Sequence, residues 1–247
     1  MSAFWQEIAA HCAARNIALY KTDRESGKEQ FEIALAPAGA LKTASDTAAL
    51  KSIVETTAAA HRMIADFAAR PFANQPGSGL HIHVHLADRE GGNVYFKHDE
   101  TMSDALRFSL GGLLSWLNPC MAVFAPADAS CRRFTQGSNA PLTVSWGGNN
   151  RTAALRLPDS EHHNKRIEHR VAGADADPGR VIAVILAALH YGLSKRCDPG
   201  GQIFGDAALP VYNLPRLIAT REEAAEALRR SILFEGYFSV SDLLPAA

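Results

Sequence analysis

Residues 77–86 have the sequence GSGLHIHVHL, in which a glycine-rich turn is followed by strict alternation of apolar and histidine residues. A period of two is that of a β-strand, whose successive side chains point to opposite faces of the sheet. We therefore expect a strand over residues 80–86, with its leucine, isoleucine and valine side chains in the core. The same alternation places His81, His83 and His85 together on the opposite face.

The sequence on either side of this strand predicts an α+β fold. Helix-like segments alternate with short strand-like segments, but without the regular rhythm of β-α-β units. We therefore expect an antiparallel β-sheet flanked by helices, in one domain over residues 1–247, with a hairpin-like turn at residues 147–150. Helices are expected over residues 4–14, 44–67, 103–117, 181–193 and 222–230, and strands over residues 17–20, 31–35, 80–86, 142–146, 153–157 and 166–171. Little regular structure is expected over residues 119–137 and 239–247.

The composition is that of a soluble globular domain, since 47% of the 247 residues are hydrophobic, 21% are charged and the formal net charge is −1. This charge argues against nucleic acid or a membrane surface as a partner. The longest apolar run, at residues 181–189, is too short to span a bilayer, and residues 1–20 lack the apolar core of a secretion signal. We therefore expect a cytoplasmic protein. Four scattered cysteines without a CxxC pair are expected to be reduced thiols: Cys12, Cys120, Cys131 and Cys197.

Three glutamates and one histidine are candidate metal ligands. Glu25 and Glu32 flank a short turn, His81 lies on the histidine face of the predicted strand, and Glu168 lies in another alternating segment. Carboxylates with one imidazole suit Mg²⁺ or Mn²⁺, which prefer oxygen ligands and keep positions open for phosphate and water. Alternatively, the glutamates belong to a solvated surface, and the histidine face is a transition-metal site or plain surface.

Five arginines within residues 133–170 form a second candidate group. Guanidinium groups match the geometry of phosphates and carboxylates. Together with metal-binding carboxylates they suit phosphoryl transfer from ATP, which requires charge neutralisation and positioning. An arginine-rich surface held by ion pairs is the alternative. Around Glu168, alternation is expected to put Arg166 and Arg170 on one face and the glutamate nearer the other. The five residues are Arg133, Arg151, Arg156, Arg166 and Arg170.

Several motifs resemble those of the glutamine synthetase family. Residues 77–83, GSGLHIH, are similar to the family signature G-S-G-M-H-x-H, and residues 25–32, ESGKEQFE, are similar to E-x-x-x-G-Q-x-E. Residues 166–170, RIEHR, resemble R-[IV]-E-x-R, and the motifs between residues 133 and 158 follow the family's order. The resemblance runs from near residue 1 to about residue 235, and it implies the catalytic-domain fold of that family.

One branch of the family is more similar than the others. Residues 146–152, WGGNNRT, and residues 170–178, RVAGADADP, resemble the γ-glutamylpolyamine (γ-glutamylputrescine) synthetases. Ordinary glutamine synthetases have a glutamate at the ammonium site where this chain has Asn139, and its absence fits a bulkier amine. The resemblance therefore implies ligation of glutamate to a polyamine-type or putrescine-type amine, with ATP and through γ-glutamyl phosphate. Ordinary glutamine synthetase activity is the alternative.

The resemblance also implies a role for each candidate residue. Glu25 and Glu32 would hold one Mg²⁺ or Mn²⁺ ion, and His81 and Glu168 would hold another. The substrate-binding positions would be Gly77, Arg133, Asn139 and Arg170. The nucleotide-binding positions would be His83, Arg151, Arg156 and Arg166, of which Arg151 and Arg166 would also be catalytic.

The resemblance is partial at the ends of the chain. The family's N-terminal β-domain and its E-x-E strand, which supplies one ligand to each metal, have no counterpart in the sequence, and the last helices stop soon after Tyr237. We therefore expect a truncated catalytic domain. A non-catalytic fragment or paralogue is a third hypothesis, and a homo-oligomer or an assembly with a full-length relative is expected.

Overall fold

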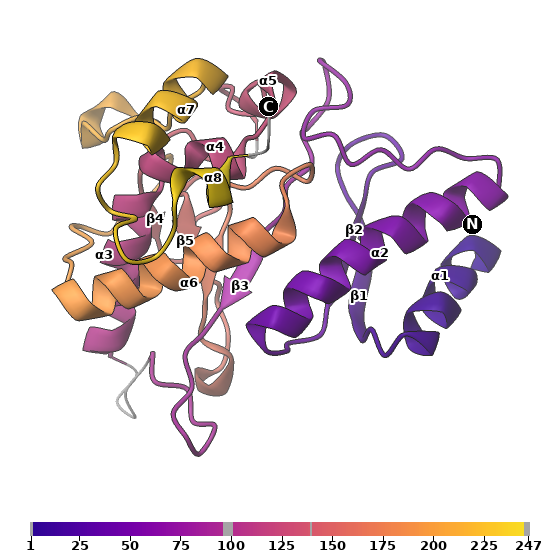
Figure 1. Ribbon diagram of the computed structural model, residues 1–247, viewed down its shortest axis with the longest axis horizontal. Helices are drawn as coiled ribbons and strands as arrows, with labels where there is room; N and C mark the ends of the chain where they lie inside the picture. The colour runs from indigo at the N-terminus through magenta and orange to yellow at the C-terminus, as the bar shows by residue number, and fades with distance from the viewer. Residues whose placement is uncertain (1, 96–100, 139, 245–247) are drawn as a thin grey trace.

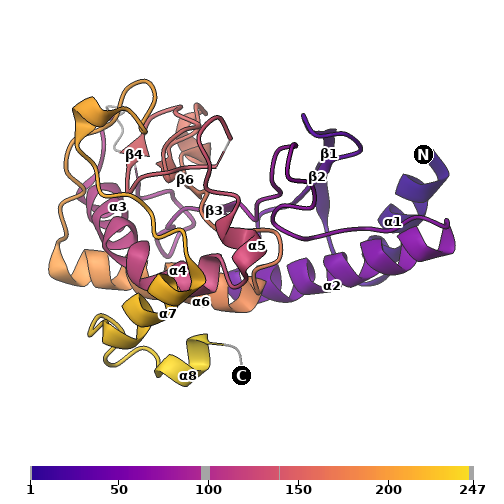
Figure 2. The same cartoon turned by 90° about the horizontal axis from the view of Figure 1, so that it is seen from above.

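A smaller N-terminal part packs against a larger body in the computed structural model, which describes residues 2–95, 101–138 and 140–244 (Figure 1). Each part has its own cluster of buried apolar side chains. Figure 2 shows α2 of the smaller part and α6 of the body following one another in one layer, with the strands on one side and α7 and α8 on the other. The fold is therefore α+β with helices flanking the sheets, as predicted.

The N-terminal part is a two-stranded antiparallel ribbon covered by two helices. Asn16 ends the first helix in the left-handed conformation, with φ of 57°, and the N–H of Ile17 turns back to the Cys12 carbonyl at 2.9 Å. The second helix begins and ends earlier than predicted. It ends early because the N–H groups of His61 and Met63 turn back onto its last carbonyls. The elements are α1 (Ser2–Ala14), β1 (Leu19–Arg24), β2 (Phe31–Leu35) and α2 (Ala40–Ala60).

The body is built on a four-stranded sheet with the order β3-β6-β5-β4. The histidine-bearing strand β3 pairs antiparallel with β6, in a register that sets His83 opposite Glu168. The pair β5 and β6 is also antiparallel and sets Arg156 opposite the same glutamate. This register brings the candidate residues of three separate motifs to one place. The strands are β3 (Ile82–Val84), β4 (Trp146–Gly147), β5 (Leu155–Arg156) and β6 (Ile167–His169).

The hairpin predicted at residues 147–150 is wrong, because β4 and β5 pair in parallel. The chain between them is held by a distant segment instead of closing on itself. The side-chain amide of Asn150 donates to the carbonyls of Ile203 and Gly205 at 3.3 and 2.8 Å, and the Thr152 hydroxyl also donates to Gly205. These long-range contacts could not be foreseen from local turn chemistry.

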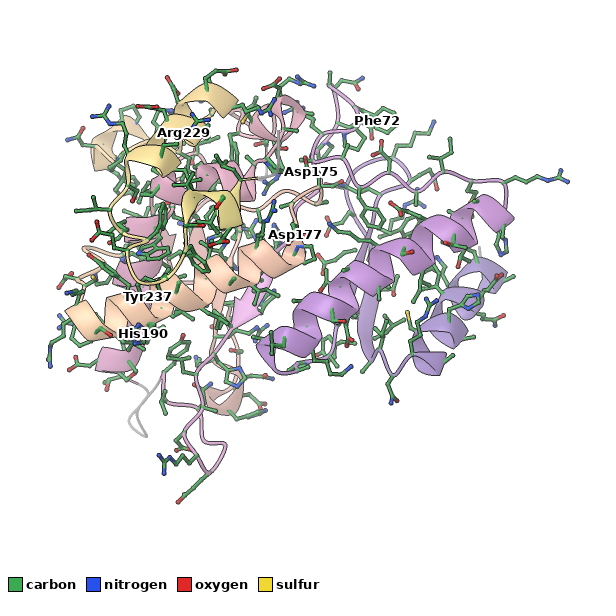
Figure 3. All side chains as sticks on the ribbon, viewed as in Figure 1. Phe72, Asp175, Asp177, His190, Arg229 and Tyr237 are labelled. Atoms are coloured by element: carbon green, nitrogen blue, oxygen red, sulfur yellow. The ribbon has the colours of Figure 1, made fainter. Side chains whose placement is uncertain are left out.

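Two long helices of the body pack against each other. The central pair is α3 (Asp104–Trp116) and α6 (Pro178–Lys195). The C-terminal segment lies against this pair, where the Tyr237 hydroxyl and His190 Nδ1 are 2.7 Å apart (Figure 3). None of the helices in the described part of the chain is long and apolar enough to cross a bilayer. The remaining elements are the helices α4 (Met121–Phe124), α5 (Asp128–Cys131), α7 (Arg221–Arg230) and α8 (Val240–Leu243), and the 3₁₀ turns Asn118–Cys120, His162–Asn164 and Pro210–Tyr212.

Candidate active site

Glu168 is the centre of the candidate site. It lies on β6 and is 2% exposed. One carboxylate oxygen accepts from Arg170 at 2.5 Å and lies 3.3 Å from His81 Nδ1, and the other accepts from Arg156 at 2.7 Å. Burial alone would raise the pKa of Glu168, but the hydrogen bond from His81 and the charge of Arg170 outweigh it and hold the pKa well below its usual range. The site therefore contains a buried, ionised carboxylate.

The prediction that Glu168 lies nearer the face opposite Arg166 and Arg170 is wrong. Residues two apart in a strand share a face, so positions 166, 168 and 170 point the same way. Their neighbour His169 points into the core, where its ring lies 4.6 Å from that of Phe124. Burial lowers the pKa of His169 to about 3, so it is neutral.

His83 and Arg166 form a second contact on the same face. Arg166 Nε donates to His83 Nδ1 at 3.0 Å, which requires that nitrogen to be unprotonated. Although His83 as a residue is exposed, protein atoms crowd its ring, and this loss of solvent, with the charge of Arg166, lowers its pKa to about 4. The pair therefore presents a neutral imidazole beside a guanidinium.

Glu25 and Glu32 face each other across the turn of the β1–β2 ribbon. The pKa of Glu32 is raised, first by loss of solvent around its carboxyl group and then by repulsion from Glu25, with a smaller contribution from Glu168. The ribbon also contacts the body directly, at the turn that precedes β3. The amide of Gln30 reaches across to the Gly77 carbonyl and the Ser78 hydroxyl, both at 3.1 Å. Gln30 was not among the predicted site residues, although its position inside the ESGKEQFE motif could have suggested it.

Gly77 is required by its surroundings. A Cβ atom there would lie 2.6 Å from the Ala69 carbonyl oxygen and 2.7 Å from the Arg133 side chain. Arg133 is 3% exposed and donates to the carbonyls of Val171 and Arg170 at 2.7 and 2.8 Å. Burial lowers the pKa of Arg133 to about 10. Arg133 thus braces the backbone at Arg170, and its direct contact with a substrate carboxylate stays a prediction.

Arg151 lies at a cavity of about 520 Å³ between residues 148–152 and 202–205. Asn149 lines the same cavity and accepts from Arg156 Nε at 3.0 Å, so the cavity adjoins the Glu168 cluster. Asn149 and Gln202, which also lines the cavity, were not predicted as site residues, because amides in loops carry no distinctive spacing. Asn139, predicted to bind the amine, lies outside the described residues.

The predicted metal ligands suit a divalent cation chemically. Loss of solvent and then repulsion from Glu25 raise the pKa of Glu32, and a cation would relieve that repulsion; burial lowers the pKa of His81, which favours the neutral imidazole that a metal requires. Among the described residues, no three His, Cys, Asp or Glu side chains come close enough to hold a metal by themselves. Mg²⁺ is often held by one or two protein carboxylates with phosphates and waters, so pairs of ligands are compatible with that ion. The assignment of these four residues stays a prediction.

Comparison with known proteins establishes the family. The profile described as glutamine synthetase, catalytic domain, matches residues 1–241, and the chain therefore belongs to the glutamine synthetase family. A gamma-glutamylputrescine synthetase, PuuA of Escherichia coli, is 42% identical over 183 residues, which are 74% of this chain and 39% of that protein. A glutamate–isopropylamine ligase of a Pseudomonas species is 33% identical over 228 residues, 91% of this chain and 50% of that protein. The glutamine synthetase of Pyrococcus abyssi is 34% identical over 194 residues, 78% of this chain and 44% of that protein.

Solved structures give the same result. A structure titled as the complex of GmaS with ADP superposes with a TM-score of 0.86 at 28% identity, covering 98% of this chain and 57% of that one. The predicted family and its catalytic-domain fold are thereby confirmed. The chain spans about half the length of the curated relatives described above.

Proposed function

We propose that this chain contributes to an ATP-dependent ligase that joins glutamate to an amine, with a polyamine-type or putrescine-type acceptor rather than ammonia. The observation that carries the proposal is the Glu168 cluster, in which one buried carboxylate is shared by His81, Arg156 and Arg170. Two relatives with amine ligase names, at 42% and 33% identity, support the choice of acceptor.

The proposed reaction has two steps. A side-chain carboxylate oxygen of glutamate attacks the γ-phosphorus of ATP, which releases ADP and forms γ-glutamyl phosphate. The amine nitrogen then attacks the γ-carbonyl carbon, inorganic phosphate leaves, and the nitrogen loses a proton to form the amide. Mg²⁺ or Mn²⁺, when bound by Glu25, Glu32, His81 and Glu168, would supply charge neutralisation at the phosphates.

The arginines of the site have distinct parts in this proposal. Arg156 donates hydrogen bonds to Glu168 and Asn149, so it holds the loop at residue 149 against β6. Arg166, held by the neutral ring of His83, keeps a defined direction for its guanidinium. Arg151 is exposed at the cavity and can reach toward a phosphate, where it would stabilise negative charge in the transition state.

The nature of the acceptor follows from position 139. An asparagine amide cannot offset the charge of an ammonium ion as a carboxylate can. We therefore infer that this position favours an amine that gains binding energy from contacts along a longer chain.

Acceptor selectivity tests this function. Phosphate release from ATP by the purified protein should require glutamate together with an amine, and should be faster with putrescine than with ammonium at equal concentrations. Equal rates with the two amines would refute the polyamine assignment and favour the glutamine synthetase alternative. A folded protein without any turnover would support the hypothesis of a non-catalytic fragment or paralogue.

A further inference from the structure

Lys51 joins the two parts of the molecule. It lies on α2, and its ammonium group donates to the carbonyls of Ala174 and Ala176 at 2.5 and 3.0 Å. Both carbonyls belong to the segment that leads from β6 into α6. Figure 3 shows Asp175 and Asp177 at the start of α6, where the two parts meet. Lys51 therefore fastens the N-terminal part to the backbone that follows Arg170.

The surroundings of Lys51 show a built contact rather than a surface lysine. Burial lowers the pKa of its ammonium group, while Asp175 and Asp177 oppose this by favouring the charged form. The ammonium nitrogen also lies 5.8 Å from the centre of the Phe67 ring. Lys42 on the same helix offers a contrast, because its side chain is half exposed and both of its partners, Asp46 and the Asn16 carbonyl, lie within the N-terminal part. An ammonium taken from water requires such partners.

The fastened segment is continuous with the candidate site. The N–H of Ala174 donates to the Ser78 carbonyl at 3.0 Å, and the N–H of Leu80 donates to the Ala172 carbonyl at 2.9 Å. Residues 172–174 are therefore paired with residues 78–80, which lie directly before His81. At the same turn, Gln30 bonds to Gly77 and Ser78 from the ribbon that carries Glu25 and Glu32. The N-terminal part is thus held at two points, one near each half of the candidate metal site.

We propose that Lys51 is a positioning residue, which sets the ribbon bearing Glu25 and Glu32 against the sheet bearing His81 and Glu168. The inference rests on the proposed function only in assuming that divalent cations bind where the ribbon and the sheet meet. Lys51 itself touches neither substrate nor metal. Its removal should let the two parts shift, and groups that orient metal ligands typically change metal affinity by about 10- to 100-fold when mutated.

Titration with Mn²⁺ alone, followed by electron paramagnetic resonance, provides a readout that does not depend on turnover. Lys51→Met is expected to weaken Mn²⁺ binding by about 10-fold or more. Hydrogen exchange should become faster at residues 174–177 and also at residues 25–32, which Lys51 does not contact. Lys42→Met is the matched control and should leave both measurements unchanged.

Lys51→Arg distinguishes loss of the contact from a general loss of folding, because it keeps a cationic donor that can reach two carbonyls. This variant should retain most of the Mn²⁺ affinity. The inference is overturned if Lys51→Met binds Mn²⁺ as the unchanged protein does, if exchange at residues 25–32 is unaffected, or if Lys51→Arg is as weak as Lys51→Met. If the unchanged protein binds Mn²⁺ but turns over no ATP, the proposed function fails and the inference on Lys51 stands.

Discussion

At the scale of single residues, the site depends on which side chains share a face of β6. Glu168 gathers two guanidinium groups and one imidazole, while Ile167 and His169 on either side are buried in the core. The alternation in residues 166–170, RIEHR, puts positions 166, 168 and 170 on one face, since they are two apart. The family resemblance implied that His81 and Glu168 share a metal, but the approach of Arg156 to Glu168 was not predicted, because it depends on the register of β5 and β6.

Glu168→Gln should strongly destabilise the protein. The amide keeps the shape of the side chain but removes the charge that offsets Arg170, which is itself 3% exposed. Removing one partner of a buried ion pair typically costs about 3–5 kcal/mol. Urea unfolding at pH 7 measures this change. Glu226→Gln, which removes an exposed pair with Arg230 on α7, should cost less than about 1 kcal/mol. Equal effects of the two substitutions would contradict the description of the site.

His169 should make stability fall as the pH is lowered from about 6.5, the usual pKa of histidine. In the folded protein its pKa is about 3, so between these values only the unfolded chain binds the proton. A group that is protonated only in the unfolded state lowers the free energy of unfolding by up to about 1.4 kcal/mol for each pH unit. Burial also lowers the pKa of His81 and His83, which adds to the slope.

His169→Phe tests this pH dependence because it keeps an aromatic ring beside Phe124 and removes the titration. Urea unfolding at several pH values between 5 and 8 should give a shallower slope for the variant. His163→Gln, at a position with an exposed side chain, should leave the slope unchanged. A slope that His169→Phe does not alter would mean that the histidine is accessible to protons in the folded protein.

At the scale of elements, α3 and α6 cross at an unusually close contact. A Cβ on Gly112 would lie 2.2 Å from the Ala188 carbonyl oxygen, and one on Gly192 would lie 2.2 Å from the Phe108 carbonyl oxygen. Both helices were predicted from their apolar spacing. Their close approach was not, because a glycine inside a helix does not show which helix lies against it.

Gly112→Ala should destabilise the protein by about 2–3 kcal/mol or more, because overpacking of a rigid contact exceeds the roughly 1 kcal/mol that alanine gains as a helix former. Gly179→Ala near the start of α6 is the control. A Cβ there would lie 3.2 Å from the Asp177 side chain, and it would meet no backbone atom of another element. Thermal unfolding should show a lower Tm for the first variant and little change for the second. Similar Tm values for both would contradict the close packing.

At the scale of the whole molecule, the candidate site is composed of two parts that are separate in sequence. The motifs indicated both parts, but the contacts that hold them together, such as Gln30 to Gly77 and Lys51 to Ala174, join residues 47 and 123 positions apart. Local pattern cannot predict such pairs. This is why the family and the long helices could be predicted from the sequence, while the positioning residues, the parallel pairing of β4 and β5 and the short helices α4 and α5 could not.

The isolated chain should associate with itself or with a partner. Several large apolar side chains are exposed, among them Leu41 at 90%, Ile64 at 95% and Val211 at 81%. The two-stranded ribbon β1–β2 also leaves strand edges available for pairing within the described residues. Size-exclusion chromatography with light scattering should show species larger than one chain, or aggregation. A stable monomer that unfolds cooperatively would contradict this expectation.

The central claim is that the arginine and carboxylate cluster activates glutamate with ATP. Hydroxylamine is a small nucleophile that captures an acyl phosphate as a hydroxamate, so γ-glutamyl hydroxamate formed from ATP, glutamate and hydroxylamine measures this activation directly. We predict hydroxamate in equal amounts to phosphate, a loss of about 100- to 1,000-fold in kcat for Arg151→Ala, and no change for the exposed Arg229→Ala. Phosphate released without hydroxamate, or hydroxamate formed equally well by Arg151→Ala, would contradict the account.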